Sequence, residues 1–213
     1  MNQKKLMQED LKLIACITML IDHFGHAIVP ELPVPYMAEL YYACRIIGRI
    51  AFPIYSFLLA ELPFDILFEG HLTWAYQSVM VTLTLGAVML LCMQKAEKKW
   101  LKLLIAIPFG VLAELAKSDY GGWGIAMIAV FALTDRLGLQ LLGLLLINSM
   151  MESALLPIFG IPVSVQLFAV FALIPIALYS GQKRTHSRVV QWGFYLFYPL
   201  HLLILWIILR IIP

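Results

Sequence analysis

The stretch "LKLIACITMLIDHFGHAIVP", residues 11–30, decides how this chain folds. It is apolar almost throughout, and its length matches the roughly 20 residues that a helix needs to cross the hydrocarbon core of a bilayer. Its second half nevertheless carries Asp22, His23 and His26. A charged side chain near the middle of a membrane helix costs about 2.5–3.5 kcal/mol on insertion scales. We therefore expect these three residues to have a partner, a cavity or a chemical task.

The composition extends this interpretation to the whole chain. Of its 213 residues, 62% are hydrophobic and 13% are charged, and the mean hydropathy is +0.88. These values lie far outside the range of soluble globular domains. Apolar runs of helical length recur along the chain, whereas a membrane barrel would show short alternating segments. The sequence predicts an all-α, polytopic transmembrane helical bundle. We expect the chain to form one integral membrane domain over residues 1–213. We expect the lipid bilayer, and no nucleic acid, among its partners.

Apolar runs, and their interruption by charged residues, Gly and Pro, predict about eight membrane segments, some of them re-entrant. They cover residues 11–29, 41–60, 72–93, 101–117, 122–134, 138–156, 163–180 and 192–212. Basic residues mark the cytoplasmic side of such segments. Three basic clusters therefore predict cytoplasmic loops and a cytoplasmic amino terminus: Lys4, Lys5 and Lys12; Lys95, Lys98, Lys99 and Lys102; and Lys183, Arg184 and Arg188.

Around residues 41–60, the predicted segments and the basic clusters do not give a consistent alternation between the two sides of the membrane. If this segment crosses the membrane once, the basic cluster at residues 95–102 falls on the outer side, against the positive-inside bias. We therefore expect one of two arrangements. Either residues 41–60 are re-entrant or strongly tilted, or a further helix is absent from this chain.

Asp22 and His23 are the candidate catalytic residues. On a helix, Asp22 and His26 are four residues apart on one face, and His23 and His26 are three apart. A carboxylate beside an imidazole holds its tautomer and supports its basicity, as a general base requires. Two alternatives stay open. The polar residues could only join helices together, or His23 and His26 could ligate a metal; no further His or Cys cluster completes such a site, and we expect no metal.

Arg45 and Arg49 in "CRIIGRIAFP", residues 44–53, form a second polar group. They are four residues apart on one helix face, and Gly48 between them permits close approach of another backbone or a ligand. Paired guanidinium groups bind phosphate or carboxylate oxygens well. Alternatively, they neutralise Asp22 or Glu61 inside the bundle. The two interpretations are compatible, because an arginine paired with Asp22 also helps to place the ring of the neighbouring histidine.

Other polar residues are candidates for contacts with substrate or for structural roles. In "YLFYPLHLL", residues 195–203, Pro199 is predicted to break the last helix and to aim Tyr198 or His201 into a cavity. A kinked helix with an interfacial tyrosine is the simpler alternative. Glu61, Asp65, Asp119 and Tyr120 are helix caps or solvated loop acids as readily as substrate contacts. Glu114 lies inside the predicted segment 101–117, where this alternative explains it less well, and His26 is a secondary candidate beside Asp22 and His23.

These stretches, taken in order, resemble the TraX family of bacterial integral membrane acyltransferases, named for the protein that N-acetylates pilin in conjugation systems. The resemblance rests on "LKLIACITMLIDHFGHAIVP", "RIIGRIAFPIYSFLLAE", "LPFDILF", "QSVMVTLTLGAVML", "SDYGGWGIAMIAVFAL" and "FYLFYPLHLLIL", which cover most of the chain. TraX-like proteins resemble in turn a broader superfamily of membrane acyltransferases. In that superfamily a histidine of the first helix is regarded as catalytic, and the resemblance implies this role for His23.

The resemblance implies that an acyl group, acetyl in the first instance, moves from acetyl-coenzyme A or another acyl-coenzyme A to an amine or hydroxyl acceptor. A pilin amino terminus, a peptide and a surface glycan are the candidate acceptors, and the location is the bacterial inner membrane. His23 would deprotonate the acceptor or carry the acyl group, and Asp22 would orient it. Arg45 and Arg49 would hold the donor phosphates or the oxyanion. Tyr198 and His201 would line the opposite wall of the donor site.

The chain departs from the family pattern after "FLLAE". The family continues there with a glycine, a short basic stretch and another helix before "ELPFD", whereas this chain runs "FLLAELPFDILF" directly. One glutamate, Glu61, stands where the family has two. Two other functions stay open: a proton-coupled transporter that uses Asp22, His23 and Arg45 as a relay, and a non-catalytic membrane partner whose polar residues fix helix packing.

Overall fold

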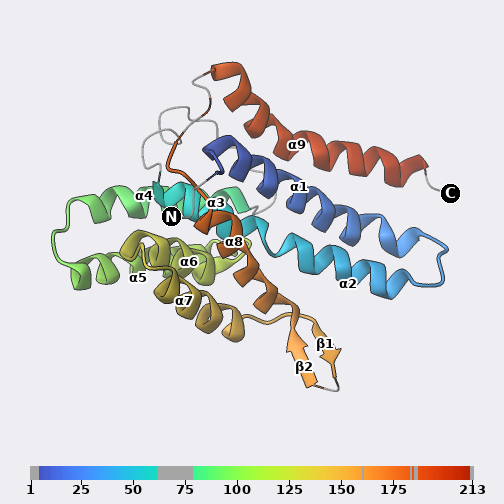
Figure 1. The fold of residues 1–213 in the computed structure, drawn as a ribbon, viewed down its shortest axis with the longest axis horizontal. Helices are drawn as coiled ribbons and strands as arrows, with labels where there is room; N and C mark the ends of the chain where they lie inside the picture. Colours follow the sequence, from blue (N-terminus) through green and yellow to red (C-terminus); the bar gives the residue numbers. More distant parts are fainter. Residues whose placement is uncertain (1–4, 62–78, 160, 183, 185–186, 212–213) are drawn as a thin grey trace. The chain divides into compact units, whose positions relative to one another are not determined.

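The structure is a computed structural model, and it describes residues 5–61, 79–159, 161–182, 184 and 187–211. The described chain is mainly helical, as predicted (Figure 1). Its α helices are α1 (Gln8–Ala27), α2 (Met37–Gly48), α3 (Ala51–Glu61), α4 (Val79–Gln94), α5 (Lys99–Leu115), α6 (Gly121–Leu133), α7 (Leu137–Met150), α8 (Leu173–Ala177) and α9 (Arg188–Ile211). Two 3-10 helices, η1 (Val29–Glu31) and η2 (Val165–Ala172), and two strands, β1 (Leu155–Ile158) and β2 (Ile161–Ser164), complete the described elements.

The chain divides into two compact units. The first unit comprises Met1–Ile54 and Glu152–Pro213, and the second comprises Tyr55–Met151. The prediction of a single functional domain is not tested by this division and stays a prediction.

The first unit is built on α1, α2 and α9, which lie side by side (Figure 1). Helices α1 and α2 form an antiparallel pair connected through η1. Their axes approach closely because Gly25 of α1 has no side chain where it meets Cys44 of α2, and a Cβ there would overlap the cysteine. Small residues permit this kind of contact between membrane helices. Helix α9 runs along α1 in the same direction.

The amino end of α1 is joined to the segment that precedes α9. Leu6 pairs with Tyr179 in a parallel bridge, and the Ser180 amide donates to the Leu6 carbonyl at 2.7 Å. Arg184 reaches both carboxylate oxygens of Asp10, at 2.8 and 3.0 Å. The segments that carry the first and third basic clusters therefore lie together. The positive-inside prediction requires these two clusters to lie on the same side of the membrane, and their proximity agrees with it. That this side is cytoplasmic stays a prediction.

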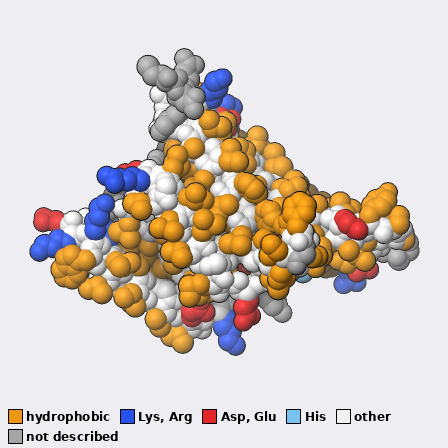
Figure 2. Space-filling view, turned by 60° about the horizontal axis from the view of Figure 1, so that its bottom comes forward, with side chains coloured by type: hydrophobic (Ala, Val, Ile, Leu, Met, Phe, Trp, Pro, Cys, Tyr) orange, Lys and Arg blue, Asp and Glu red, His pale blue; other side chains and the backbone are white. Residues whose placement is uncertain are grey.

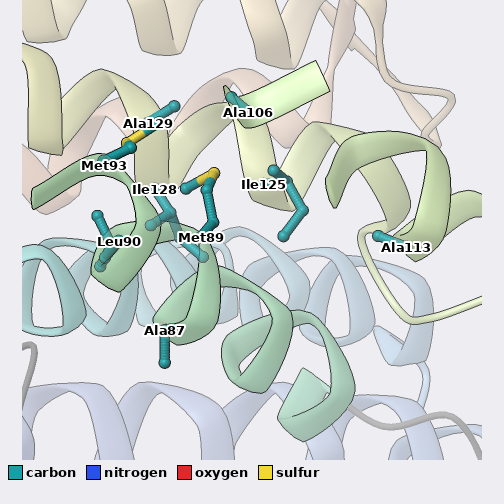
Figure 3. Packing of buried hydrophobic residues seen from close by; sticks show 9 residues of the cluster. All are labelled: Ala87, Met89, Leu90, Met93, Ala106, Ala113, Ile125, Ile128 and Ala129. Atoms are coloured by element: carbon teal, nitrogen blue, oxygen red, sulfur yellow. The ribbon is translucent and has the colours of Figure 1, made fainter. Parts of the chain in front are cut away.

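The second unit packs α4, α5 and α6 around a buried apolar cluster (Figure 3). The cluster consists of Ala87, Met89, Leu90, Met93, Ala106, Ala113, Ile125, Ile128 and Ala129. Alanines on α5 and α6 let these helices come close, and the methionines of α4 fill the remaining space, since their unbranched side chains adapt to irregular gaps. Phe57 of α3 packs edge-on against Phe131 of α6, with ring centroids 5.7 Å apart.

The predicted segment 41–60 is not one continuous helix but two helices, and whether it is re-entrant stays a prediction. Helix α2 ends at Gly48, and α3 begins at Ala51. Pro53 explains the interruption: it cannot donate a hydrogen bond to the carbonyl of Arg49, four residues earlier, and its ring would clash with that carbonyl. Proline is tolerated in the first turn of a helix, which is where Pro53 lies in α3.

The prediction of an all-α fold fails at residues 155–164. The segment forms an antiparallel hairpin in which Leu155 pairs with Ser164 and Pro157 with Pro162. Two prolines within six residues disfavour a helix, and Phe159 adopts a left-handed φ of 51° at the turn. The end of the predicted segment 138–156 is therefore strand.

Two further segments differ from the prediction. Residues 163–180 contain η2 and the short helix α8 instead of one membrane helix. Pro175 in α8 cannot bond to the Phe171 carbonyl, which disfavours a continuous α helix through this region. By contrast, Pro199 does not break the last helix, since α9 is continuous from Arg188 to Ile211. Loss of one backbone bond is tolerated inside long apolar helices.

Only one helical stretch of the described chain, Gln8–Glu31, is long and apolar enough to cross a membrane by itself. Shorter apolar helices cover Val79–Gln94, Gly121–Leu133, Leu137–Met150, Val165–Ala177 and Leu200–Ile211. The expectation of about eight spans therefore holds in a coarser form, as a mainly helical chain with many apolar helices. Hydrophobic side chains cover much of the face in Figure 2, and charged groups gather at its margins.

Candidate functional site

Asp22 of α1 forms ion pairs with Arg45 of α2 and with Arg49, the residue that caps the end of α2. Its Oδ2 accepts from Nη1 of Arg45 at 2.8 Å, and its Oδ1 accepts from Nη2 of Arg49 at 3.0 Å. The three side chains are mostly buried, with 14%, 25% and 13% of their surfaces exposed, respectively. The four-residue spacing puts both arginines on the face of α2 that meets α1. The predicted partnership of Asp22 with Arg45 or Arg49 is confirmed, and both arginines take part.

Gly48 makes this ion cluster sterically possible. A Cβ at position 48 would overlap the Cβ, Cγ and Oδ1 atoms of Asp22. The carboxylate consequently lies against the backbone of α2, between Arg45 and Arg49. This is the close approach that the glycine in "RIIGR" predicts.

Gln166 of η2 completes the surroundings of Arg49. Its Oε1 accepts from Arg49 Nη1 at 3.0 Å, and Arg49 Nε donates to the Arg45 carbonyl at 3.2 Å. Gln166 is 2% exposed, and its Nε2 has no hydrogen-bond partner in the part of the chain that the structure describes. A buried donor without an acceptor costs free energy. Sequence reasoning missed this residue, although a glutamine inside the apolar run 163–180 was an available signal.

His23 of α1 contacts His201 of α9. Nδ1 of His23 lies 2.6 Å from Nε2 of His201, and the two rings are within 6° of coplanar with centroids 4.9 Å apart. A coplanar pair joined nitrogen to nitrogen is a hydrogen bond made edge to edge, whereas stacked rings would overlap face to face. The prediction put His201 in a wall opposite His23. The structure brings the two imidazoles into direct contact.

The His201 ring is held on its other edge by its own helix. Its Nδ1 lies 2.7 Å from the carbonyl oxygen of Phe197, one turn earlier in α9. The Phe197 ring stacks on the imidazole, with centroids 4.8 Å apart and planes within 15°. His201 is itself buried, at 3% exposure, whereas His23 is half-buried. The less exposed imidazole is thus the one with both nitrogens engaged.

Four other candidates remain to be placed: His26 and Tyr198 belong to the first unit, and Glu61 and Asp65 fall in the second. His26 is exposed on α1. Tyr198 lies in α9 three residues before His201, and its side chain is outside the description. Glu61 is the last residue of α3, and Asp65 lies outside the described residues.

Glu114, Asp119 and Tyr120 belong to the second unit and have visible structural tasks. Glu114 Oε1 accepts from the Gly122 amide at 2.8 Å, in the first turn of α6. Asp119 uses its carbonyl to accept from Thr82 Oγ1. Tyr120 precedes α6 with a left-handed φ of 63°. These contacts fit the alternative in which the residues cap and join helices.

The site can therefore combine two chemical elements. One is a pair of imidazoles with one nitrogen, Nε2 of His23, that has no hydrogen-bond partner among the described residues. The other is an ion cluster in which two guanidinium groups and one carboxylate leave a net charge of +1. Asp22 and His23 are adjacent in the sequence, so both elements meet on the same turn of α1. A base and a positively charged group on the same helical turn suit proton transfer beside a developing negative charge.

Comparison with known proteins gives one family. No curated protein and no solved structure matches the chain significantly. The family model described as TraX protein matches in two segments, residues 7–62 and 58–209. Residues 58–62 belong to both segments, at the point where the sequence departs from the family pattern. The matched segments together span most of the chain and include all the residues of the site, and the chain therefore belongs to the TraX protein family.

Proposed function

We propose that this protein is a membrane-embedded acyltransferase that moves an acyl group, in the first instance acetyl, from an acyl-coenzyme A to an amine or hydroxyl acceptor. One observation carries the proposal: the half-buried imidazole of His23 stands beside an Asp22 carboxylate that two arginines over-neutralise. Membership of the TraX family, which is associated with acetylation of pilin, supports the same chemistry.

Exposed apolar faces support the membrane location. Helices α5, α7 and α9 each leave large hydrophobic side chains uncovered along several turns: Leu103, Leu104, Ile107, Val111 and Leu115; Leu141, Leu142, Leu145 and Leu146; and Leu200, Leu203, Ile204 and Ile207. Soluble monomers rarely expose contiguous apolar surfaces of this kind, whereas lipid covers them without cost. We propose a multi-pass protein of the bacterial inner membrane with a cytoplasmic amino terminus, since the basic clusters favour that side.

In the proposed reaction, His23 acts as the general base. It accepts the N–H or O–H proton of the acceptor while the acceptor nitrogen or oxygen bonds to the acyl carbon. The thioester C–S bond then breaks, and His23 returns the proton to the leaving sulfur of coenzyme A. The products are an amide or ester and a free thiol, so atoms and charge balance. A positioned base typically contributes about 10²–10⁴-fold to such a step.

The ion cluster has the charge that this reaction needs. A tetrahedral intermediate develops negative charge on the former carbonyl oxygen, and the donor carries phosphates. The net charge of +1 on Arg45, Asp22 and Arg49 attracts either group. Gln166 adds a buried amide donor, Nε2, that lacks an acceptor in the described chain. An oxygen of the bound acyl-coenzyme A would accept a hydrogen bond from this Nε2.

A proton-coupled transporter is the principal alternative, because hydrogen-bonded imidazoles also conduct protons. The contact of His201 with Phe197 weighs against it. Nδ1 of His201 faces a backbone carbonyl, which accepts a hydrogen bond but has no proton of its own to pass on. A non-catalytic partner is the other alternative, and it predicts that changes at His23 alter stability alone.

The test uses the full chain purified into lipid nanodiscs with acetyl-coenzyme A labelled in the acetyl group. Acceptors are peptides with a free amino terminus, the same peptides with a blocked terminus, and an oligosaccharide. The wild type is expected to transfer label to one acceptor class, and His23→Ala to lose about 10²-fold or more. His26→Ala is the matched control, since His26 is exposed on the same helix, and it should retain activity. Equal turnover by folded His23→Ala and the wild type would remove the assignment.

A further inference from the structure

We infer that His201 is a positioning residue that fixes the tautomer of His23, so that Nε2 of His23 is the nitrogen left to react. The consequence for catalysis rests on the proposed acyl transfer, but the tautomer itself does not. The inference follows from the hydrogen-bond chain that links Phe197, His201 and His23.

The chain has a defined direction because it begins at a carbonyl. The oxygen of Phe197 can only accept, so Nδ1 of His201 must carry the hydrogen that it donates across 2.7 Å. A neutral imidazole has one N–H, and Nε2 of His201 is consequently a bare acceptor.

The same reasoning assigns the hydrogen on His23. Nε2 of His201 lies 2.6 Å from Nδ1 of His23, and a bare acceptor requires a donor there. Nδ1 of His23 therefore carries its hydrogen. The remaining nitrogen of His23, Nε2, holds a free lone pair. This pattern gives a base that is ready to accept a proton without first exchanging one.

The rings are also fixed in orientation. The two imidazoles are within 6° of coplanar, and the Phe197 ring covers one face of His201. A rotation of His201 about its side chain would break its hydrogen bonds to Phe197 and to His23 at once. His23 is thus aligned by a partner that is buried and rigid, which is how the orienting member of a catalytic triad acts.

The sequence predicted that Asp22 would orient His23, but both carboxylate oxygens of Asp22 are bound by arginines. Oδ1 and Oδ2 of Asp22 each accept a guanidinium N–H. His201 differs from a carboxylate orienter because it is neutral when it accepts. When His23 takes up a proton, its Nδ1–H still has its acceptor on His201. The two residues therefore have different roles: His201 aligns His23, and Asp22 holds Arg45 and Arg49 in place.

The direct test is the tautomer of His23, read by ¹⁵N magnetic resonance of full-length protein with labelled histidine in nanodiscs. The chain has five histidines, so His23→Gln and His201→Gln variants identify the signals. In the wild type, His23 is expected to carry hydrogen on Nδ1 and none on Nε2. Hydrogen on Nε2 of neutral His23 would overturn the inference, whatever the activity.

Two substitutions at residue 201 then separate alignment from packing. Glutamine offers an oxygen near the place of Nε2 and accepts from His23, whereas leucine accepts nothing. His201→Gln should keep the Nδ1–H form of His23 and most of kcat. His201→Leu should shift His23 towards the Nε2–H form and lower kcat on the order of 100-fold, with KM for acetyl-coenzyme A unchanged. Equal loss of kcat in both variants, with His23 still in the Nδ1–H form, would contradict alignment.

The inference about the tautomer and the proposed function can be contradicted independently of each other. If the wild type has the expected tautomer but transfers no acyl group to any acceptor, the hydrogen-bond chain stands and the proposed function falls. If it transfers acyl groups while His23 carries its hydrogen on Nε2, the function stands and the positioning role of His201 falls. His26→Leu, on the same helix, should change neither readout.

Discussion

Gly48 of α2 lies against the side chain of Asp22 of α1 so closely that no Cβ could be accommodated between them. This contact sets the spacing of the two helices at the point where the ion cluster forms. It also lets Arg45 and Arg49 approach one carboxylate from either side of the glycine. The steric fit and the electrostatic pairing therefore depend on each other.

Substitution Gly48→Ala should separate the helices and weaken both ion pairs. An added methyl in a packed interface typically costs about 1–3 kcal/mol, and the group it displaces here is the carboxylate itself. We expect a lower midpoint of thermal unfolding and loss of acyl transfer. Gly193→Ala is the control, because nothing lies within 4 Å of a Cβ at that position in α9. It should be neutral or slightly stabilising, since alanine favours helix. An unchanged midpoint for Gly48→Ala would contradict the close contact.

Substitution Asp22→Asn should be strongly destabilising. It leaves two mostly buried guanidinium groups without a counter-charge, and removal of one partner from a buried ion pair costs about 3–5 kcal/mol. Thermal unfolding in detergent measures the effect. Arg184→Ala offers a comparison in the same unit, because it removes an ion pair whose arginine side chain is 59% exposed. That loss should stay below about 1 kcal/mol. If the two variants unfold together, the cluster at Asp22 is not the stabilising centre that its burial indicates.

The two arginines should differ in their tolerance of lysine. Arg49 uses Nε, Nη1 and Nη2 to reach three acceptors, on Arg45, Gln166 and Asp22, and one ammonium group cannot replace this fork. Arg45 makes its described bond through Nη1 alone. Arg49→Lys is therefore expected to lower the unfolding midpoint more than Arg45→Lys, by the equivalent of one or two charged hydrogen bonds at about 1.5–3 kcal/mol each. The reverse order would show that the bond to Gln166 contributes nothing.

Part of this architecture follows from sequence alone. The apolar run 11–29 gave α1 nearly as found, Gln8–Ala27, because length and composition determine a membrane helix. The ion pair of Asp22 was also predictable. A carboxylate in an apolar helix needs a cation, and the arginines at residues 45 and 49 share one helix face.

Other features depend on tertiary contacts that no local pattern encodes. His23 and His201 are 178 residues apart, and nothing in the spacing of the five histidines indicates which two meet. Because Asp22 is adjacent to His23, it was the expected partner of the His23 ring. In the structure, Asp22 pairs instead with the guanidinium groups of Arg45 and Arg49. The hairpin at 155–164 was not predicted, because its residues are as apolar as those of the predicted membrane segments on either side of it.

Glu114 provides a test in the second unit, where it accepts a hydrogen bond from the Gly122 amide at the start of α6. The carboxylate also faces the positive end of the helix dipole. Glu114→Gln keeps an acceptor oxygen and should cost a few tenths of a kcal/mol, whereas Glu114→Ala removes the acceptor and should cost about 1 kcal/mol. Hydrogen exchange measures the effect directly, since the first turn of α6 should lose protection in the alanine variant and keep most of it in the glutamine variant. Because the described contact of Glu114 is the bond that caps α6, folded Glu114→Gln should retain acyl transfer. Loss of transfer with α6 still protected would instead make Glu114 a substrate contact.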